Sequence, residues 1–162
     1  MEHKTFIRWA KISLILIYLV IIAGATVRMT GSGMGCPDWP KCFGYYIPPT
    51  QVEELLWEPN HKYENGQVII KNNALWIANG TFTSTDVYNP SNWQEYTKHD
   101  YAEFNPYHTW IEYINRLCGA LAGVACLVLF FLSFKYWQTK KSVVLWAGIV
   151  LALLVFNAWL GA

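Results

Sequence analysis

The sequence predicts an all-α membrane protein with three transmembrane helices and one large loop on the outer side of the membrane. Hydrophobic residues make up 54% of the chain and charged residues only 14%, whereas soluble domains carry about 25% charged residues. The charged residues gather in one central polar stretch and leave long apolar runs on either side. A helix needs about 20 mostly apolar residues to cross the hydrocarbon core, and the apolar runs reach that length.

The apolar runs set the predicted boundaries of the chain. A short N-terminal segment, residues 1–11, precedes a first transmembrane helix over residues 12–28. A secretory signal peptide is the competing interpretation of this run, but the run is long for one and lacks a typical cleavage site after it. The second helix is predicted over residues 108–134 and the third over residues 143–162. Because the third run stops without a polar flank, we expect the chain to be part of a longer protein.

Positive charge predicts the orientation. Lys4, Arg8 and Lys11 precede the first helix, and the link formed by residues 135–142 holds three further lysines. Cytoplasmic segments carry an excess of Lys and Arg, so both segments are predicted inside and the loop 29–107 outside. We therefore expect a multi-pass protein of the bacterial cytoplasmic membrane, surrounded by lipid, with its N-terminus inside. The net charge of +1 gives no sign of a nucleic-acid partner.

The outer loop contains its own secondary-structure signals. The stretch GQVIIKNNALWIANG has strand-like runs near the turn signals Asn65-Gly66 and Asn79-Gly80. This pattern predicts a small hairpin. His61 and His99, like His3 at the N-terminus, are expected to be solvated.

Cysteines suggest one disulfide. Cys36 and Cys42 enclose five residues just outside the first helix, in a compartment that is oxidising in most bacteria. The pair is either a structural staple or a redox-active couple, and the residues alone leave both interpretations open. Cys118 and Cys126 fall within the second helix, where we expect them to pack as small apolar side chains without a disulfide.

A second group of candidate residues opens the second helix. His108, Glu112 and Asn115 are spaced i, i+4 and i+7, so they share one face of a helix. A carboxylate in a transmembrane helix normally faces a functional cavity. The alternatives are an ion pair between Glu112 and Arg116, or an interfacial Glu with a snorkelling Arg.

Two segments in this order resemble the N-terminal half of the heme A synthase family. They are VRMTGSGMGCPDWPKCFG after the first helix and IEYINRLCGALAG at the start of the second. The resemblance leaves out residues 50–105, which look like an insertion. It implies an eight-helix bundle of two four-helix halves, of which this chain supplies part of the first. It also implies an enzyme that converts heme O to heme A, by oxidising a porphyrin methyl to a formyl, for cytochrome oxidase.

The resemblance carries over to particular residues. Glu112 matches a functional glutamate of the family, and Cys36 and Cys42 match its outer cysteine pair. Heme b is the implied cofactor and heme O the substrate, in a site that the missing second half completes. Arg28 and Arg116 are placed where heme propionates could be paired.

One position departs from the family pattern. The family reads Glu-x-x-His in the second helix, and Asn115 stands in place of that histidine. Because a carboxamide is a poor ligand for iron, His108 is the candidate ligand instead. It lies on the same face, about 10 Å along the helix axis.

Two other functions are compatible with the same residues. One is a membrane thiol–disulfide oxidoreductase that passes electrons from Cys36 and Cys42 to a quinone. The other is a non-catalytic heme-binding assembly factor for cytochrome oxidase. Candidate protein partners are a heme O-producing enzyme and a second copy of the chain, and the fragment alone is expected to be inactive.

Overall fold

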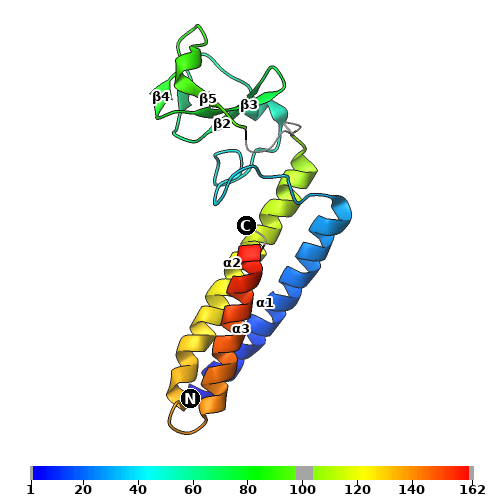
Figure 1. Ribbon diagram of the computed structural model, residues 1–162, viewed down its shortest axis with the longest axis vertical. Coiled ribbons are helices and arrows are strands. Elements are labelled where there is room, and N and C mark those ends of the chain that lie inside the picture. Colours follow the sequence, from blue (N-terminus) through cyan, green and yellow to red (C-terminus); the bar gives the residue numbers. More distant parts are fainter. Residues whose placement is uncertain (1, 98–103, 161–162) are drawn as a thin grey trace. The chain divides into compact units, whose positions relative to one another are not determined.

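The computed structural model describes residues 2–97 and 104–160 and divides the chain into two compact units (Figure 1). The helical unit consists of Met1–Thr26 and Ile114–Ala162, and the loop unit consists of Val27–Tyr113. His99 lies outside the described residues.

Three helices are long and apolar enough to cross a membrane: α1 (Glu2–Thr30), α2 (Pro106–Ser133) and α3 (Lys141–Leu160). The predicted fold class is therefore confirmed. Residues 2–11 are helical as well and form the first turns of α1. A 3-10 turn, η3 (Phe134–Tyr136), ends α2 and leads toward α3.

The start of α2 is determined by its own sequence. The Asn105 side-chain oxygen accepts hydrogen bonds from the backbone N–H groups of Tyr107 at 3.0 Å and His108 at 3.4 Å. Pro106 occupies the first helical position, where its missing N–H has no intrahelical partner to lose. An Asn cap followed by Pro therefore starts α2 just before the residues of the candidate site.

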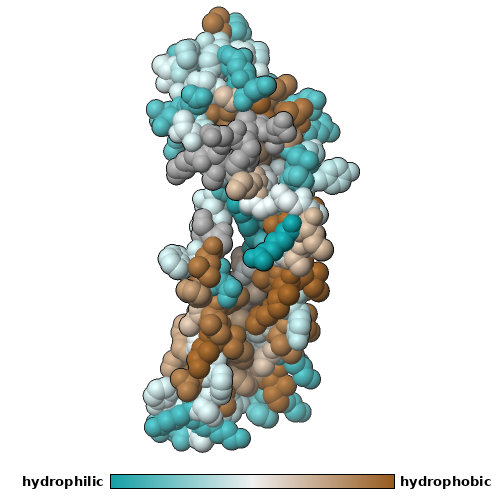
Figure 2. Space-filling view, turned by 45° about the vertical axis from the view of Figure 1, so that its right-hand side comes forward, coloured by the Kyte–Doolittle hydropathy of each residue, from teal (hydrophilic) through white to brown (hydrophobic). Residues whose placement is uncertain are grey.

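Most of the apolar surface of the helices faces outward. Only 11%, 22% and 6% of the most apolar stretches of α1, α2 and α3 are buried inside the protein. Figure 2 shows hydrophobic side chains gathered over these helices. Between α2 and α3, Gly148 lies against the Phe130 ring, and an added Cβ there would come within 3.2 Å of it. In a bilayer the exposed apolar side chains are covered by lipid or by further helices.

The loop unit contains two small antiparallel sheets. In one, β2 (Val68–Lys71) pairs with β3 (Ala74–Ala78), and β3 pairs with β5 (Trp93–Glu95). In the other, β1 (Lys62–Tyr63) pairs with β4 (Phe82–Thr83). Two 3-10 turns, η1 (Val52–Leu55) and η2 (Pro90–Asn92), complete the described secondary structure.

The predicted hairpin is confirmed as β2 and β3, although its turn is formed by Asn72 and Asn73. Both residues have positive φ, 54° and 59°, and Asn tolerates this left-handed conformation better than most residues. The turn signals Asn65-Gly66 and Asn79-Gly80 flank the hairpin instead. The third strand, β5, gives the hairpin the support that an isolated hairpin lacks.

Two buried clusters form the core of the loop unit. An aromatic cluster contains Tyr63, Ile69, Ala78 and Trp93. The Trp93 ring lies edge-on to the Tyr63 ring, with the ring centroids 4.9 Å apart. The other cluster includes the disulfide itself and contains Cys36, Cys42, Phe43, Leu55, Val68 and Leu75. The cysteine loop is therefore part of a packed core.

Candidate functional site

The predicted Cys36–Cys42 disulfide is confirmed. The two Cα atoms lie 4.9 Å apart, and the residues are only 5% and 0% exposed. Cys118 and Cys126 form no disulfide, again as predicted, with Cys126 buried and Cys118 half-buried. The bonded pair closes a short loop, residues 36–42, that we call the cysteine loop.

The residues after the cysteine loop bring the chain back on itself. Phe43 and Gly44 have positive φ, 56° and 79°, and Cys42 and Tyr45 pair on either side of them. The Gly44 N–H donates to the Asp38 carboxylate at 2.8 Å. An added Cβ on Gly44 would come within 2.9 Å of Gln67 N. This tight return packs the cysteine loop against the strand region.

A tyrosine also ties the cysteine loop to the sheet. The Tyr96 hydroxyl, one residue after β5, donates to the Pro37 carbonyl oxygen. Burial, together with the nearby Asp38 carboxylate, raises the pKa of Tyr96. The hydroxyl therefore keeps the proton that this hydrogen bond requires.

Glu112 lies beside the disulfide. Its side chain is only 7% exposed, and its Oε2 accepts a hydrogen bond from the Cys36 backbone N–H at 2.9 Å. A buried carboxylate must be hydrogen-bonded to remain charged at an acceptable cost. The structure thus brings Glu112 to the cysteine pair, although Glu112 and Cys36 are 76 positions apart in the chain.

Two neighbours of Glu112 on α2 hold the same loop region. The Thr109 hydroxyl donates to the Gly35 carbonyl oxygen at 2.9 Å, and the Tyr113 hydroxyl donates to the Tyr46 carbonyl oxygen at 2.8 Å. Thr109, Glu112 and Tyr113 are spaced i, i+3 and i+4, so one helix face makes all three contacts.

Gly35 allows the close approach. A Cβ built at this position would overlap the His108 carbonyl group and lie 2.7 Å from Thr109 N. The backbone of the loop therefore rests directly on the first turn of α2. Gly35 belongs to the glycine-containing segment that the sequence marked, whereas Thr109 and Tyr113 were not among the residues predicted from the sequence. The only signal for these two is position, because they lie three residues before and one residue after Glu112.

The other predicted site residues occupy varied positions. His108 is half-buried in the first turn of α2, and Arg28 is exposed near the end of α1. Asn115 and Arg116 belong to the helical unit and are half-buried. The Asn115 side-chain oxygen lies 3.8 Å from the position of a Cβ built on Gly24, so the carboxamide faces a glycine of α1.

A heme would require an imidazole for its iron and cationic side chains for its propionates. The chain has four histidines, and those on described helices, His3 and His108, lie in the first turns of α1 and α2. In residues 2–97 and 104–160, no group of three or more His, Cys, Asp or Glu could hold a metal ion. Arg28 and Arg116 suit propionates, whereas Asn115 does not suit iron.

Fold and site together define a class: a multi-pass membrane protein with a buried carboxylate held by a disulfide-closed loop. The family model described as COX15-CtaA, cytochrome oxidase assembly protein, matches residues 7–76 and 81–162. This match covers nearly the whole chain, so the chain belongs to the COX15-CtaA family. The predicted family resemblance is thereby confirmed, but residues 50–105 are not outside it as expected, because the match includes them apart from residues 77–80.

Curated relatives carry the name heme A synthase. The protein of Shewanella oneidensis is 28% identical over 151 residues, which are 93% of this chain and 34% of that protein. Over shorter stretches, identity is 39% across 67 residues with the Alkalihalophilus pseudofirmus protein and 35% across 72 residues with the Lysinibacillus sphaericus protein. The chain thus spans about a third of the length of the first relative. No solved structure matches the chain.

Proposed function

We propose that this chain is the N-terminal part of a heme A synthase-type oxidoreductase, which converts heme O to heme A for cytochrome oxidase. Family membership and the name of its relatives support the reaction class. The observation that carries the proposal is the buried Glu112 carboxylate, held by Cys36 N–H at 2.9 Å. An enzyme that oxidises a ring methyl needs a positioned group to take up or supply protons, and a fixed carboxylate meets that need.

The residues of the chain would act by binding and orientation. Heme iron supplies the oxidation chemistry when heme is bound, and the protein supplies placement and electrostatics. Glu112 exchanges a proton near the porphyrin edge, and the Cys36 N–H fixes the direction of its carboxylate. Arg28 and Arg116 pair with propionates.

The cysteine pair serves in this proposal as a structural clamp. Thiol–disulfide exchange requires that a thiolate reach a disulfide sulfur, and Cys36 and Cys42 are almost fully buried. Burial therefore disfavours the alternative of a thiol–disulfide oxidoreductase. The remaining alternative, a non-catalytic heme-binding assembly factor, predicts heme binding without heme A formation.

The proposed location is the bacterial cytoplasmic membrane, with the N-terminus and the α2–α3 link inside and the loop unit outside. The basis is the excess of lysines and arginines at the cytoplasmic ends of helices. Single cysteines replacing Asn72 and Gln138 can be probed with a membrane-impermeant reagent. Labelling of Asn72→Cys from the cytoplasmic side would overturn the orientation.

Glu112→Gln in the complete protein tests the function. The amide oxygen can still accept the Cys36 N–H, so the loop contact is kept while the proton-exchanging group is lost. We expect heme A yield to fall by about 100-fold, the usual effect of losing a general acid or base. The measurement is heme A content by chromatography, normalised to protein level in membranes. A full yield at normal protein level would remove Glu112 from the catalytic residues.

Two further variants address iron ligation. Asn115→Ala should lower heme content only mildly, because a carboxamide is not expected to hold the iron. His108→Ala should change the absorption spectrum of the bound heme if His108 is the ligand. An unchanged spectrum at normal heme content would exclude His108 from that role.

A further inference from the structure

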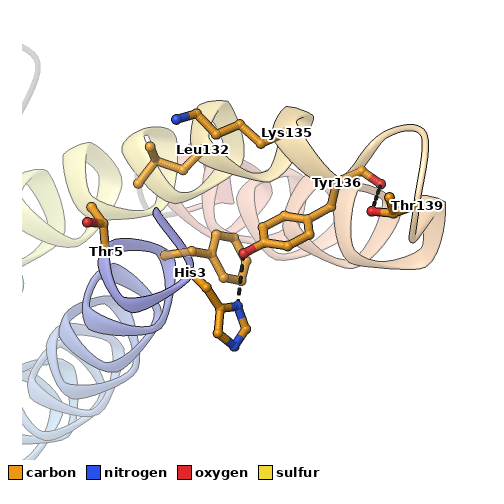
Figure 3. A pocket seen from close by; sticks show the side chains of 7 residues that line it. His3, Thr5, Leu132, Lys135, Tyr136 and Thr139 are labelled. Atoms are coloured by element: carbon orange, nitrogen blue, oxygen red, sulfur yellow. Dashed lines mark hydrogen bonds between the residues drawn. The ribbon is translucent and has the colours of Figure 1, made fainter. Parts of the chain in front are cut away.

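The beginning of α1, the end of α2 and the segment joining α2 to α3 line a pocket of about 330 Å³ (Figure 3). All of its walls belong to the helical unit. It is lined by seven residues: His3, Thr5, Phe6, Leu132, Lys135, Tyr136 and Thr139. None of the predicted site residues lines it, and the proposed reaction does not use it.

Tertiary contacts build one wall of this pocket. His3 Nδ1 lies 3.0 Å from the Tyr136 hydroxyl, joining residues 133 positions apart. The Phe6 ring meets the Tyr136 ring edge-on, with centroids 5.0 Å apart. Figure 3 shows the Tyr136 side chain reaching from η3 toward His3. The pocket therefore depends on the packing of α1 against η3.

The chemistry of the lining suits an anion. Lys135 supplies an ammonium group, and Thr5 and Thr139 supply hydroxyls, of which that of Thr139 donates to the Tyr136 carbonyl oxygen. No carboxylate is among the lining residues that the structure describes. Ammonium and hydroxyl groups donate to phosphate oxygens. Phe6 and Leu132 give the same pocket an apolar portion.

The surrounding segments add positive charge. Residues 1–8 carry Lys4 and Arg8 against the single acid Glu2, and residues 134–142 carry Lys135, Lys140 and Lys141 with no acid. Such clusters attract anionic phospholipids when they lie next to a transmembrane helix. Each of the three spans begins or ends here, at His3, Tyr136 and Lys141, which puts the pocket at a membrane boundary.

We propose that this pocket binds the headgroup phosphate of an anionic phospholipid, with an acyl chain against Phe6 and Leu132. A soluble phosphate compound has the same anionic group but no acyl chain that could pack against Phe6 and Leu132. At a membrane boundary a phospholipid presents both chemistries together, so it is the occupant that fits the whole lining.

The test measures lipid retention by the intact protein in nanodiscs of phosphatidylglycerol and phosphatidylcholine. Native mass spectrometry of the released protein should find phosphatidylglycerol retained in preference to phosphatidylcholine. Lys135→Gln should reduce its retention by about fivefold, the effect of one basic residue near an anionic lipid, and Lys135→Arg should keep it. The matched control is Lys11→Gln, an exposed basic residue of α1 outside the pocket, with an expected change below about twofold.

Three results would overturn the proposal. One is equal loss of phosphatidylglycerol from Lys135→Gln and Lys11→Gln, which would mean a diffuse electrostatic effect. Another is retention with no preference between the two lipids. The third is displacement of the lipid by millimolar inorganic phosphate, which would assign the pocket to a soluble anion. Retention that phosphate does not reduce supports a lipid site.

Discussion

The two units of this protein are stabilised by different kinds of contact. In the helical unit, less than a quarter of the most apolar stretch of any helix is buried inside the protein. The loop unit instead has two buried clusters, two small sheets and a disulfide. Helices that satisfy their own backbone hydrogen bonds can face lipid with few side-chain contacts between them. A polar loop in water needs a core of its own.

This difference between the units predicts where a substitution should change stability or activity. Several specific contacts in the loop unit support the cysteine loop, and through it Glu112, so the loss of one of them should have a measurable effect. On the lipid-facing sides of the helices, apolar substitutions remove few contacts within the protein.

Gly35→Ala should open the contact between the cysteine loop and α2. The new Cβ would overlap the His108 carbonyl, and relief of such crowding costs about 2–3 kcal/mol. An opening free energy lower by 2 kcal/mol raises the open fraction by roughly 30-fold. The rate of disulfide reduction by a soluble phosphine, followed by alkylation and mass spectrometry, should rise accordingly.

Gly33→Ala is the matched control for that experiment. A Cβ at Gly33 would meet only Val27 Cγ1, at 3.7 Å, an ordinary contact. Its reduction rate should stay within about twofold of the original, since surface substitutions rarely change stability by more than 0.5 kcal/mol. Equal rates for Gly35→Ala and Gly33→Ala would contradict the close packing of the loop on α2.

Removing the disulfide should destabilise the loop unit alone. The double substitution of Cys36 and Cys42 by Ser frees a loop with a sequence separation of only 6, and closure of so short a loop is worth about 2 kcal/mol. Urea titration in detergent, followed by limited proteolysis, should show earlier cleavage between Cys42 and Glu95. Cys118→Ser, within the helical unit, should leave that midpoint unchanged. An unaltered midpoint in the double variant would mean that packing alone holds the loop.

Thr109→Val should have a smaller effect of the same kind. It keeps the shape of the side chain but removes the hydrogen bond to the Gly35 carbonyl oxygen, at a cost of about 1 kcal/mol. The disulfide should then be reduced roughly fivefold faster, and heme A yield in the complete protein should fall. Thr109→Ser, which restores the hydroxyl, should recover both. Failure of Ser to recover either property would contradict the assignment of the effect to the hydroxyl alone.

Alkaline pH should weaken the loop unit gradually. Burial raises the pKa of Tyr45, Tyr63 and Tyr88 above the ordinary value for a tyrosine. A group whose pKa is raised by folding contributes stability below its unfolded pKa and loses that contribution as the pH rises through the folded pKa. The urea midpoint of loop cleavage should therefore fall above about pH 10. Tyr45→Phe should reduce this pH dependence, and an identical dependence would show that Tyr45 contributes nothing to it.

Sequence patterns were sufficient for the helical unit and for some of the loop unit. The length and polarity of each apolar run predicted the three helices, because an apolar run of that length has one stable arrangement in a bilayer. Strand-like runs predicted the β2–β3 hairpin, but its turn at Asn72 and Asn73 was not predicted, because the turn signals Asn65-Gly66 and Asn79-Gly80 lie outside the hairpin. The spacing and compartment of Cys36 and Cys42 suggested their disulfide, although whether it is a staple or a redox couple stayed open.

Tertiary structure alone decided what surrounds Glu112. The sequence marks this residue through helical spacing and family resemblance, yet ion pairing with Arg116 was an equally local alternative. Only the folded loop unit brings the Cys36 N–H to the carboxylate and Gly35 to the backbone of α2. These partners lie more than 70 positions apart, and no local period links them. Their meeting depends on how the whole segment between α1 and α2 packs, which is a property of the fold.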